Sequence, residues 1–525
     1  MNIAVQVNLK SLSSKLSWNE LKKHSLFTEA YNTDSTWIKN FLDSPAVSGI
    51  DTDKGIFFFV QKENNGGYIA IEGSIKDEAA FKIFCTRLAS NTAIKEEAGI
   101  QYITRFPDCV GWNDKQFIFV MDAPEMQQMD ELNRRMQQDS IDISNHSPRD
   151  VAATCKSLFE LEEKKSLAAN DKFGSLLKEE GDLHVWANTE VFYRDVKLPD
   201  VLGMINLEKF YKESITTAVV NFEKGRIKVN AHSFSNAALS KVFEKFAGGK
   251  VSEAMLRKLP GENVVAALAI NFKPEALLEI AKVINLDGII NTYSPALGFT
   301  TNDFIKANKG DIVFGVSDLT MVADSIPATE MYIPFTMYKP AFNTVFAAAV
   351  ADKNSFDKLY NTGNKAAAMF LNTQGYPLFT TYNNNYFVMG NTKANADAFI
   401  NATPDKNHDF VNAMAGSSVA GYINLQSLIK GLTGKDSSSS VNRAMYDASL
   451  KLWDNMLLKG GDFANGALNY SLEINMMDKN TNSLQQLNTY ATVMSNLIEQ
   501  QRKKELEDMR TMQDAFPDEV IPKTK

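Results

Sequence analysis

Four short segments of this chain alternate apolar and polar residues and then change to the 3.6-residue period of a helix. Each alternation ends in an asparagine, and this pattern predicts a strand that runs directly into a helix. The side chains of these asparagines are out of phase with the main apolar set of each strand. Either each asparagine ends its strand and caps the following helix, or the four amides line a shared surface. The four residues are Asn8, Asn188, Asn271 and Asn424.

A second pattern, a strand or hairpin followed by a polar turn and a helix, comes after each asparagine. In the first two copies the turns are Asn-Asn-Gly-Gly at 64–67 and Glu-Lys-Gly at 223–225, both typical of hairpins. In the last two copies the strands 344–350 and 467–476 lead into turns that begin Asp-Lys-Asn. The first and third copies carry an extra hairpin and helix, over residues 101–136 and 377–401.

The copies therefore follow the order long, short, long, short, which predicts a tandem duplication. One half is expected to span residues 1–247 and the other 262–500, with the glycine- and proline-containing segment 248–261 as the linker. A polar, mostly helical stretch at about 138–180 is expected to be an insertion in the first half. Residues 501–525 are expected to form a charged helix end and a flexible tail.

Strands paired as hairpins, with helices between them and no regular βαβ spacing, predict an α+β fold. We expect two tandem copies of a strand–helix plus hairpin–helix module, with antiparallel sheets covered by helices mainly on one face. Gln6 is expected to point away from the helices. The side chains expected to face the helices are Val5, Val7 and Leu9, and in the second half Leu268, Ile270 and Phe272.

Composition excludes a mostly disordered chain, because 44% of the residues are hydrophobic and only 22% are charged. The 525 residues are enough for roughly two to four domains. The formal net charge is −8, whereas a nucleic-acid binder needs a concentrated basic face. No stretch approaches the roughly 18 consecutive apolar residues of a membrane-spanning helix. The chain enters a strand as early as Ile3, so we expect that a natural upstream segment is missing.

Catalytic, cofactor and metal motifs are missing from the sequence. It contains no H-E-x-x-H, G-x-S-x-G or G-x-G-x-x-G pattern, and none of the five histidines lies at ligand spacing. Cys85, Cys109 and Cys155 form no C-x-x-C pair, which argues against a zinc ribbon and a disulfide framework. A single bridge between Cys85 and Cys109 stays open. We therefore expect no cofactor and no metal site, and the sequence names no catalytic residue.

Three segments resemble a known family. They are the opening stretch from Val5 to Trp18, the strand 263–270 before Asn271, and the late turn from Asp478 to Leu484. Together they resemble a domain-of-unknown-function family of long Bacteroides-type cell-envelope lipoproteins. This resemblance implies an exported protein, periplasmic or at the surface, that contacts the membrane only through a lipid anchor on an upstream cysteine.

The interpretation we favour is an envelope-associated protein with a non-enzymatic role in binding or assembly. Its partner would be an unknown envelope protein or ligand, and not a nucleic acid. The alternative is an extracytoplasmic hydrolase whose carboxylate site the sequence does not reveal, and a cytosolic scaffold is a third reading. A pocket of titratable groups with shifted pKa values would favour the enzyme. An exposed apolar or aromatic groove would favour binding.

Because no set of residues has metal-ligand spacing, chelation is expected to leave the stability unchanged. A structural metal contributes directly to the folding free energy, so its removal lowers the melting temperature. We therefore expect the same melting temperature with and without EDTA in a thermal unfolding scan. A fall of several degrees on adding EDTA would show that a metal site escaped the sequence analysis.

Overall fold

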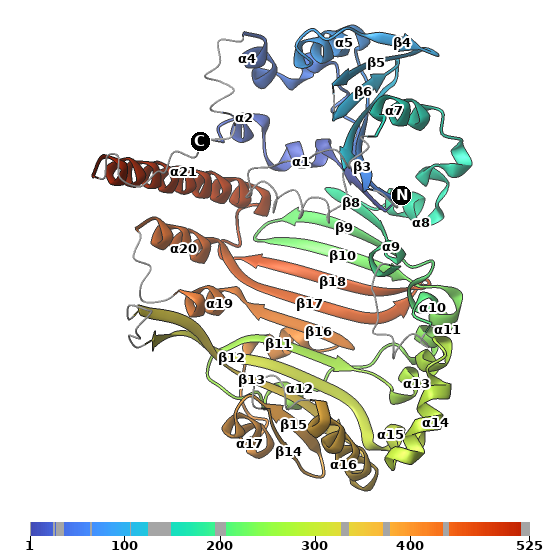
Figure 1. The fold of residues 1–525 in the computed structure, drawn as a ribbon, viewed down its shortest axis with the longest axis vertical. Coiled ribbons are helices and arrows are strands. Elements are labelled where there is room, and N and C mark those ends of the chain that lie inside the picture. Colours follow the sequence, from blue (N-terminus) through green and yellow to red (C-terminus); the bar gives the residue numbers. More distant parts are fainter. Residues whose placement is uncertain are drawn as a thin grey trace, which may run out of the picture.

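The computed structural model of the protein describes residues 2–24, 27, 36–63, 66–105, 107–123, 149–194, 206–326, 335–370, 378–433 and 440–515. These residues form an α+β fold in which one antiparallel sheet of 18 strands extends along the long axis of the molecule (Figure 1). The predicted fold class is therefore confirmed. Of the predicted features, the helix that ends the 101–136 unit, the beginning of the insertion at 138–180 and the tail at 516–525 lie outside the described residues.

Every strand pairs antiparallel with its neighbours in one continuous series. In the first half the order is β4 (Lys95–Glu97), β5 (Ile100–Arg105), β6 (Asp108–Trp112), β7 (Gln116–Ala123), β3 (Gly66–Ser74), β2 (Ile56–Glu63), β1 (Ile3–Val7), β8 (Leu183–Asn188), β9 (Ile215–Glu223) and β10 (Arg226–Phe234). The series continues through the second half with β18 (Ala467–Met476), β17 (Trp453–Ala464), β16 (Val419–Asn424), β11 (Val264–Asn271), β12 (Asn308–Ile326), β13 (Phe335–Val350), β15 (Tyr386–Gly390) and β14 (Phe379–Tyr382).

The two halves have the same pairing order. The series β6-β7-β3-β2-β1-β8-β9-β10 corresponds strand by strand to β14-β15-β13-β12-β11-β16-β17-β18. The register also corresponds, since the backbone N–H of Asn8 donates to the carbonyl of Asp182 at 2.9 Å and that of Asn271 to the carbonyl of Ser418 at 2.7 Å. A duplication predicts this correspondence. The duplication itself, and its boundaries at 247 and 262, stay predictions.

The halves meet where β10 pairs with β18. This ladder joins eight residue pairs, from Arg226 opposite Asn475 to Ser233 opposite Leu468. The turn before β10 strengthens the junction, because the N–H of Gly225 donates to the carbonyl of Thr481 at 2.9 Å. Within the described residues, the sheet therefore passes from one half to the other without an edge.

Several helices begin at side chains that accept the otherwise unpaired N–H groups of the first turn. Asn236 caps α11 (Ala237–Phe246) and Asp77 caps α5 (Glu78–Leu88). The long helix expected near the end of the chain is α21 (Ser483–Ala515). The other α-helices are α1 (Leu9–Lys15), α2 (Trp18–Leu21), α4 (Thr36–Asp43), α7 (Val151–Phe159), α8 (Asp171–Leu176), α9 (Glu190–Arg194), α10 (Glu208–Tyr211), α12 (Glu253–Leu256), α13 (Pro274–Val283), α14 (Asp287–Leu297), α15 (Thr301–Ala307), α16 (Lys353–Phe370), α17 (Lys393–Asn401), α18 (Asp409–Met414), α19 (Leu425–Leu432) and α20 (Ser440–Leu452). Short 3-10 helices are η2 (Pro45–Ser48), η3 (Glu163–Lys165) and η4 (Leu167–Ala169).

One face of the sheet, called here the covered face, packs against helices in both halves. In the first half α7 and α8 cover it, and in the second half α12, α17 and α18 do so. Several strand side chains in these cores are small, such as Ala4, Ala70, Ala269 and Ala347, each at most 2% exposed. Small residues let helices pack close to the sheet. The segment 248–261 supplies α12 to the second of these cores.

The opposite face, called here the open face, carries larger apolar side chains that stay partly accessible. Phe58 and Val60 of β2, Leu268 of β11 and Phe314 of β12 are 36–39% exposed. Helices cover this face only locally: Phe81 of α5 stacks on Phe117, and α16 packs aromatic rings on β14 and β15. Figure 1 shows the middle strands β9, β10, β18 and β17 with the helices gathered at their ends.

The predicted assignment of side chains to faces is wrong. Ala267 and Ala269 lie in the helix-covered core, whereas Leu268 between them is 39% exposed. In β1 the buried side chain is Ala4, and its neighbour Val5 is only partly buried. The prediction gave more weight to the larger apolar residues, but the helices pack on the phase that holds the alanines.

No helix among the described residues is long and apolar enough to cross a membrane.

Truncating one phenylalanine on each face tests this assignment. Phe399 of α17 is fully buried against the covered face, and Phe314 on the open face is 38% exposed. Phe399→Ala is expected to cost about 3–5 kcal/mol, because transfer and cavity terms add. Phe314→Ala should cost less than about 2 kcal/mol, since part of its ring already meets water. Urea midpoints measure both values. Equal losses of stability in the two variants would mean that both faces of the sheet lie in closed cores.

Candidate functional site

The four recurring asparagines act mainly at helix starts. Asn8 accepts a hydrogen bond from the N–H of Ser11 at 3.1 Å, and Asn424 accepts one from the N–H of Ser427 at 2.9 Å. Asn188 accepts from the N–H of Glu190 at 3.2 Å. Asn271 differs, because its amide donates to the carboxylate of Asp311 at 2.7 Å and α13 starts three residues later without a side-chain cap.

The structure does not bring these four amides together. Antiparallel pairing places Asn8 and Asn424 at the ends of strands that point the same way, and Asn188 and Asn271 at the opposite strand ends. In Figure 1 α1 lies near the middle and α19 on the left, whereas α9 and α13, which follow the second pair, lie on the right. A shared asparagine surface is therefore not formed.

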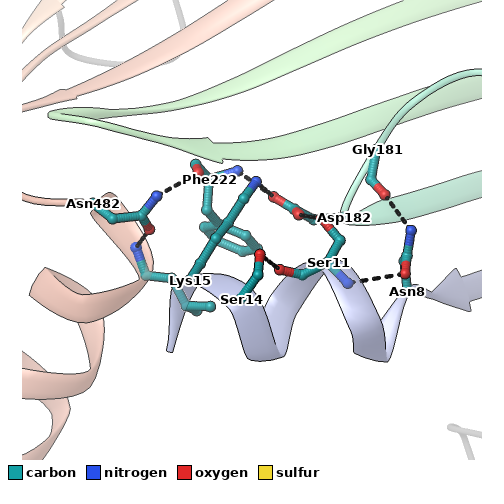
Figure 2. Close-up of polar contacts among 9 residues, drawn as sticks. Asn8, Ser11, Ser14, Lys15, Gly181, Asp182, Phe222 and Asn482 are labelled. Atoms are coloured by element: carbon teal, nitrogen blue, oxygen red, sulfur yellow. Dashed lines mark hydrogen bonds and ion pairs between the residues drawn. The ribbon is translucent and has the colours of Figure 1, made fainter. Parts of the chain in front are cut away.

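Asn8 leads instead to a buried carboxylate, that of Asp182 (Figure 2). Asp182 is fully buried, and its Oδ1 accepts from the hydroxyl of Ser11 at 2.6 Å. Its Oδ2 accepts from Lys15 Nζ and from the backbone N–H of Phe222, both at 2.6 Å. Three donors, one of them charged, compensate for removing the carboxylate from water.

The same cluster connects the first half with the last helix. Asn482, just before α21, donates from its amide to the carbonyl of Phe222 at 2.8 Å and accepts from the N–H of Leu484 at 2.9 Å. Figure 2 shows α1, β8, β9 and the start of α21 converging on this point. Because the Asp182 carboxylate is fully buried and accepts three hydrogen bonds within the protein, the arrangement holds elements together and leaves the carboxylate out of reach of a substrate.

A polar hollow of about 450 Å³ lies beside this cluster. Its lining includes Gln6, Asn8, Glu179, His184 and Asn221. His184 is 3% exposed, and its Nε2 lies 2.9 Å from the carbonyl oxygen of Glu179, which places the ring hydrogen on Nε2. The other ring nitrogen, Nδ1, has no partner among the described residues. The hollow is thus lined by amides and by the charged side chains of Lys15, Glu179 and Glu180, and the hydroxyl of Ser11 in its lining is bound to Asp182.

An apolar pocket of about 460 Å³ lies at the edge of the open face. Its floor includes Met456 and Ile474, which belong to the open face of β17 and β18. Its polar groups are few: the hydroxyl of Ser449 lies 2.9 Å from that of Tyr490 and is thereby paired. The walls come from α19, α20 and the start of β17, through Leu425, Ile429, Leu432, Tyr446 and Trp453.

Groups of three or more metal-ligating side chains are absent from the described ranges. All three cysteines are free and buried, so the bridge between Cys85 and Cys109 that the sequence left open does not form. Burial raises the pKa of the Cys85 thiol to about 12, which makes it a poor nucleophile.

Comparison with known protein families assigns the chain to one of them. A family model for a domain of unknown function matches residues 1–406, which is most of the chain. The chain belongs to the family Domain of unknown function (DUF4836). The resemblance found in the sequence is confirmed at this level, and the family description names no activity.

Solved structures give weaker similarity to this DUF4836 chain. Crystal form III of TP0453 is 10% identical, with a TM-score of 0.27, and covers 45% of this chain and 77% of its own. Crystal form I of TP0453 is 8% identical, with a TM-score of 0.26, and covers 45% and 76%. These values are too low to indicate a common fold. Among curated proteins, none matches the chain.

Sequence reasoning found Asn8 but missed the groups around it. Ser11 and Lys15 are four residues apart and therefore share one helix face, which was an available signal. Asp182 is one of three acidic residues just before β8, with Glu179 and Glu180, and nothing local marks it as the buried one. The apolar pocket could not be predicted from the sequence either, because its walls come from α19, α20 and β17, and local patterns do not show that these elements lie together.

Removing the buried carboxylate should destabilise the protein. Asp182→Ala leaves Lys15 and the N–H of Phe222 without their acceptor, and breaking a buried pair costs about 3–5 kcal/mol. Chemical denaturation measures the loss. Lys353→Ala is the matched control, because it breaks an exposed pair with Asp357 and should cause no measurable change. A similar small effect for both variants would mean that the Asp182 cluster does not hold these elements together.

Proposed function

We propose that this DUF4836 protein is an exported cell-envelope protein with a non-enzymatic role, and that it binds acyl chains on the open face of its sheet. The apolar pocket under α19 and α20 carries the proposal. Its volume of about 460 Å³ is within the range of roughly 300–1,000 Å³ typical of small-ligand sites. The envelope location follows from the lipoprotein resemblance and is part of the proposal.

Acyl chains fit the chemistry of this pocket. Its wall consists of aliphatic and aromatic side chains, and the Ser449 hydroxyl is already paired with Tyr490. Each methylene that leaves water for such surroundings gains about 0.8 kcal/mol. Met456 and Ile474 connect the pocket with the open face, where Leu268 and Phe314 remain more than a third exposed. A chain longer than the pocket can therefore continue along the sheet.

The shape of the open face favours a flexible chain over a second copy of the protein. Two sheets packed face to face lie about 10 Å apart and need flat, unobstructed surfaces. Here α5 packs on the open face near β7, and α16 packs on it near β14 and β15. α19 rises over the same face beside Met456. A flat partner would meet these helices first, whereas a single chain can lie between them.

The alternative of a hydrolase has less support. The best candidate carboxylate, that of Asp182, accepts three hydrogen bonds within the protein and is fully buried. A catalytic base needs a free acceptor within reach of substrate. The exposed apolar surface, in contrast, is the feature that a binding role requires.

The test is a fluorescence titration with 11-(dansylamino)undecanoic acid. We expect the probe to bind the full chain and to brighten as it leaves water. Leu432→Asp places a charge on the pocket wall at a side chain that is 44% exposed, so the fold should tolerate it. We expect its affinity for the probe to fall at least tenfold.

Leu506→Asp is the matched control, since Leu506 is 45% exposed on α21 and does not line the pocket. It should bind the probe as the unmodified protein does. Failure of the unmodified protein to bind, or equal affinities for the Leu432→Asp and Leu506→Asp variants, would contradict the proposal.

A further inference from the structure

A second apolar pocket lies on the other side of the sheet, under the helices of the covered face. It has a volume of about 270 Å³ and is enclosed by β2, β3 and β7 and by the segment from α7 to α8. Aromatic and aliphatic side chains dominate its lining, and Glu72 is its only carboxyl group. The apolar lining residues include Phe57, Phe59, Ile118, Leu158 and Phe173.

Glu72 is unusual because of what surrounds it. Its cross-strand neighbours are Phe57 on β2 and Ile118 on β7, and neither can donate a hydrogen bond. Within the described residues its carboxyl group has no hydrogen bond or ion pair. Burial raises the pKa of this carboxyl above its usual value, which shows that its surroundings disfavour the unpaired charge. Asp182, by comparison, has three donors for its carboxylate.

No side chain of the pocket lining carries a positive charge. The guanidinium of Arg149, which lies 5.2 Å above the ring of the lining residue Tyr68, pairs with Glu63 at 2.7 Å, so its charge is already engaged. An unpaired carboxylate in an apolar site is costly, and a cation that enters with the ligand removes that cost. An anionic ligand would instead meet an uncompensated like charge.

We propose that this pocket binds a lipophilic primary amine, with its ammonium group at Glu72 and its hydrocarbon chain among the aromatic rings of the pocket. The ammonium group donates charge-assisted hydrogen bonds to the carboxylate, which are stronger than neutral ones. The faces of Phe57 and Phe59 add cation–π attraction where they approach the charge. The site is independent of the acyl-chain proposal, because it lies on the opposite face of the sheet.

Isothermal titration of the full chain with octylamine, octanol and octanoate tests the proposal. The titrations use the Leu432→Asp background, so that the octyl chains do not bind in the open-face pocket. These ligands share one chain length and differ in the head group. We expect octylamine to bind at least tenfold more tightly than octanol, and octanoate to bind most weakly. Glu72→Gln keeps the shape of the side chain and removes the charge. It should weaken octylamine binding at least tenfold and leave octanol binding unchanged.

Two further variants keep the result specific. Glu96→Gln changes an exposed carboxylate on β4 and should leave octylamine binding as it is. Leu432→Asp, used as the background of every titration, blocks the open-face pocket, so this proposal and the acyl-chain proposal can fail separately. The site is overturned if octylamine does not bind, if octanol binds as tightly as octylamine, or if Glu72→Gln has no effect on the amine.

Discussion

The pairing of β10 with β18 is the interaction on which the rest of the structure depends. It links eight residue pairs that are more than 230 positions apart in the chain, from Arg226 with Asn475 to Ser233 with Leu468. Without this ladder each half would end in a long strand with unpaired N–H and carbonyl groups, which invites non-specific association. With it, one sheet has two continuous faces, and each face can have its own chemistry.

The β10–β18 junction carries polar side chains on the covered face and apolar side chains on the open face. On the covered side, His232 Nδ1 lies 2.5 Å from the amide oxygen of Asn469. On that side Arg226 also pairs with Glu473 at 3.2 Å. On the open side Val229 lies directly opposite Leu472. The helix-covered cores of the two halves are therefore divided by a polar strip, whereas the apolar surface of the open face passes from one half to the other.

Local features of this fold could be predicted from the sequence because short-range physics determines them. The Glu-Lys-Gly turn at 223–225 predicts a hairpin, and Glu223 does pair with Arg226 across it. Asp77 and Asn236 cap the helices that follow them, as their residue types favour. The family resemblance holds at the level of the domain of unknown function, and two of the three segments on which it rests lie within the matched residues 1–406.

Features that depend on distant residues could not be predicted in this way. No local pattern shows that β10 and β18 are partners. The choice of covered face was predicted wrongly, because Ala267 and Ala269 gave a weaker apolar signal than Leu268 and yet are the residues on which the helices pack. Glu72 is one acidic residue in an otherwise apolar strand, and only the neighbouring Phe57 and Ile118 show that its carboxyl lacks a donor.

The central claim is that the open face receives an acyl chain next to Trp453, and tryptophan quenching by a brominated fatty acid tests it most directly. Trp453 lines the open-face pocket, whereas Trp186 is 4% exposed in a core of the covered face. Bromine quenches only nearby indole rings. The account predicts that the brominated chain quenches part of the fluorescence, that Trp453→Phe removes most of this quenching, and that Trp186→Phe leaves it unchanged. Quenching that survives in Trp453→Phe and disappears in Trp186→Phe would place the chain on the wrong face and contradict the account.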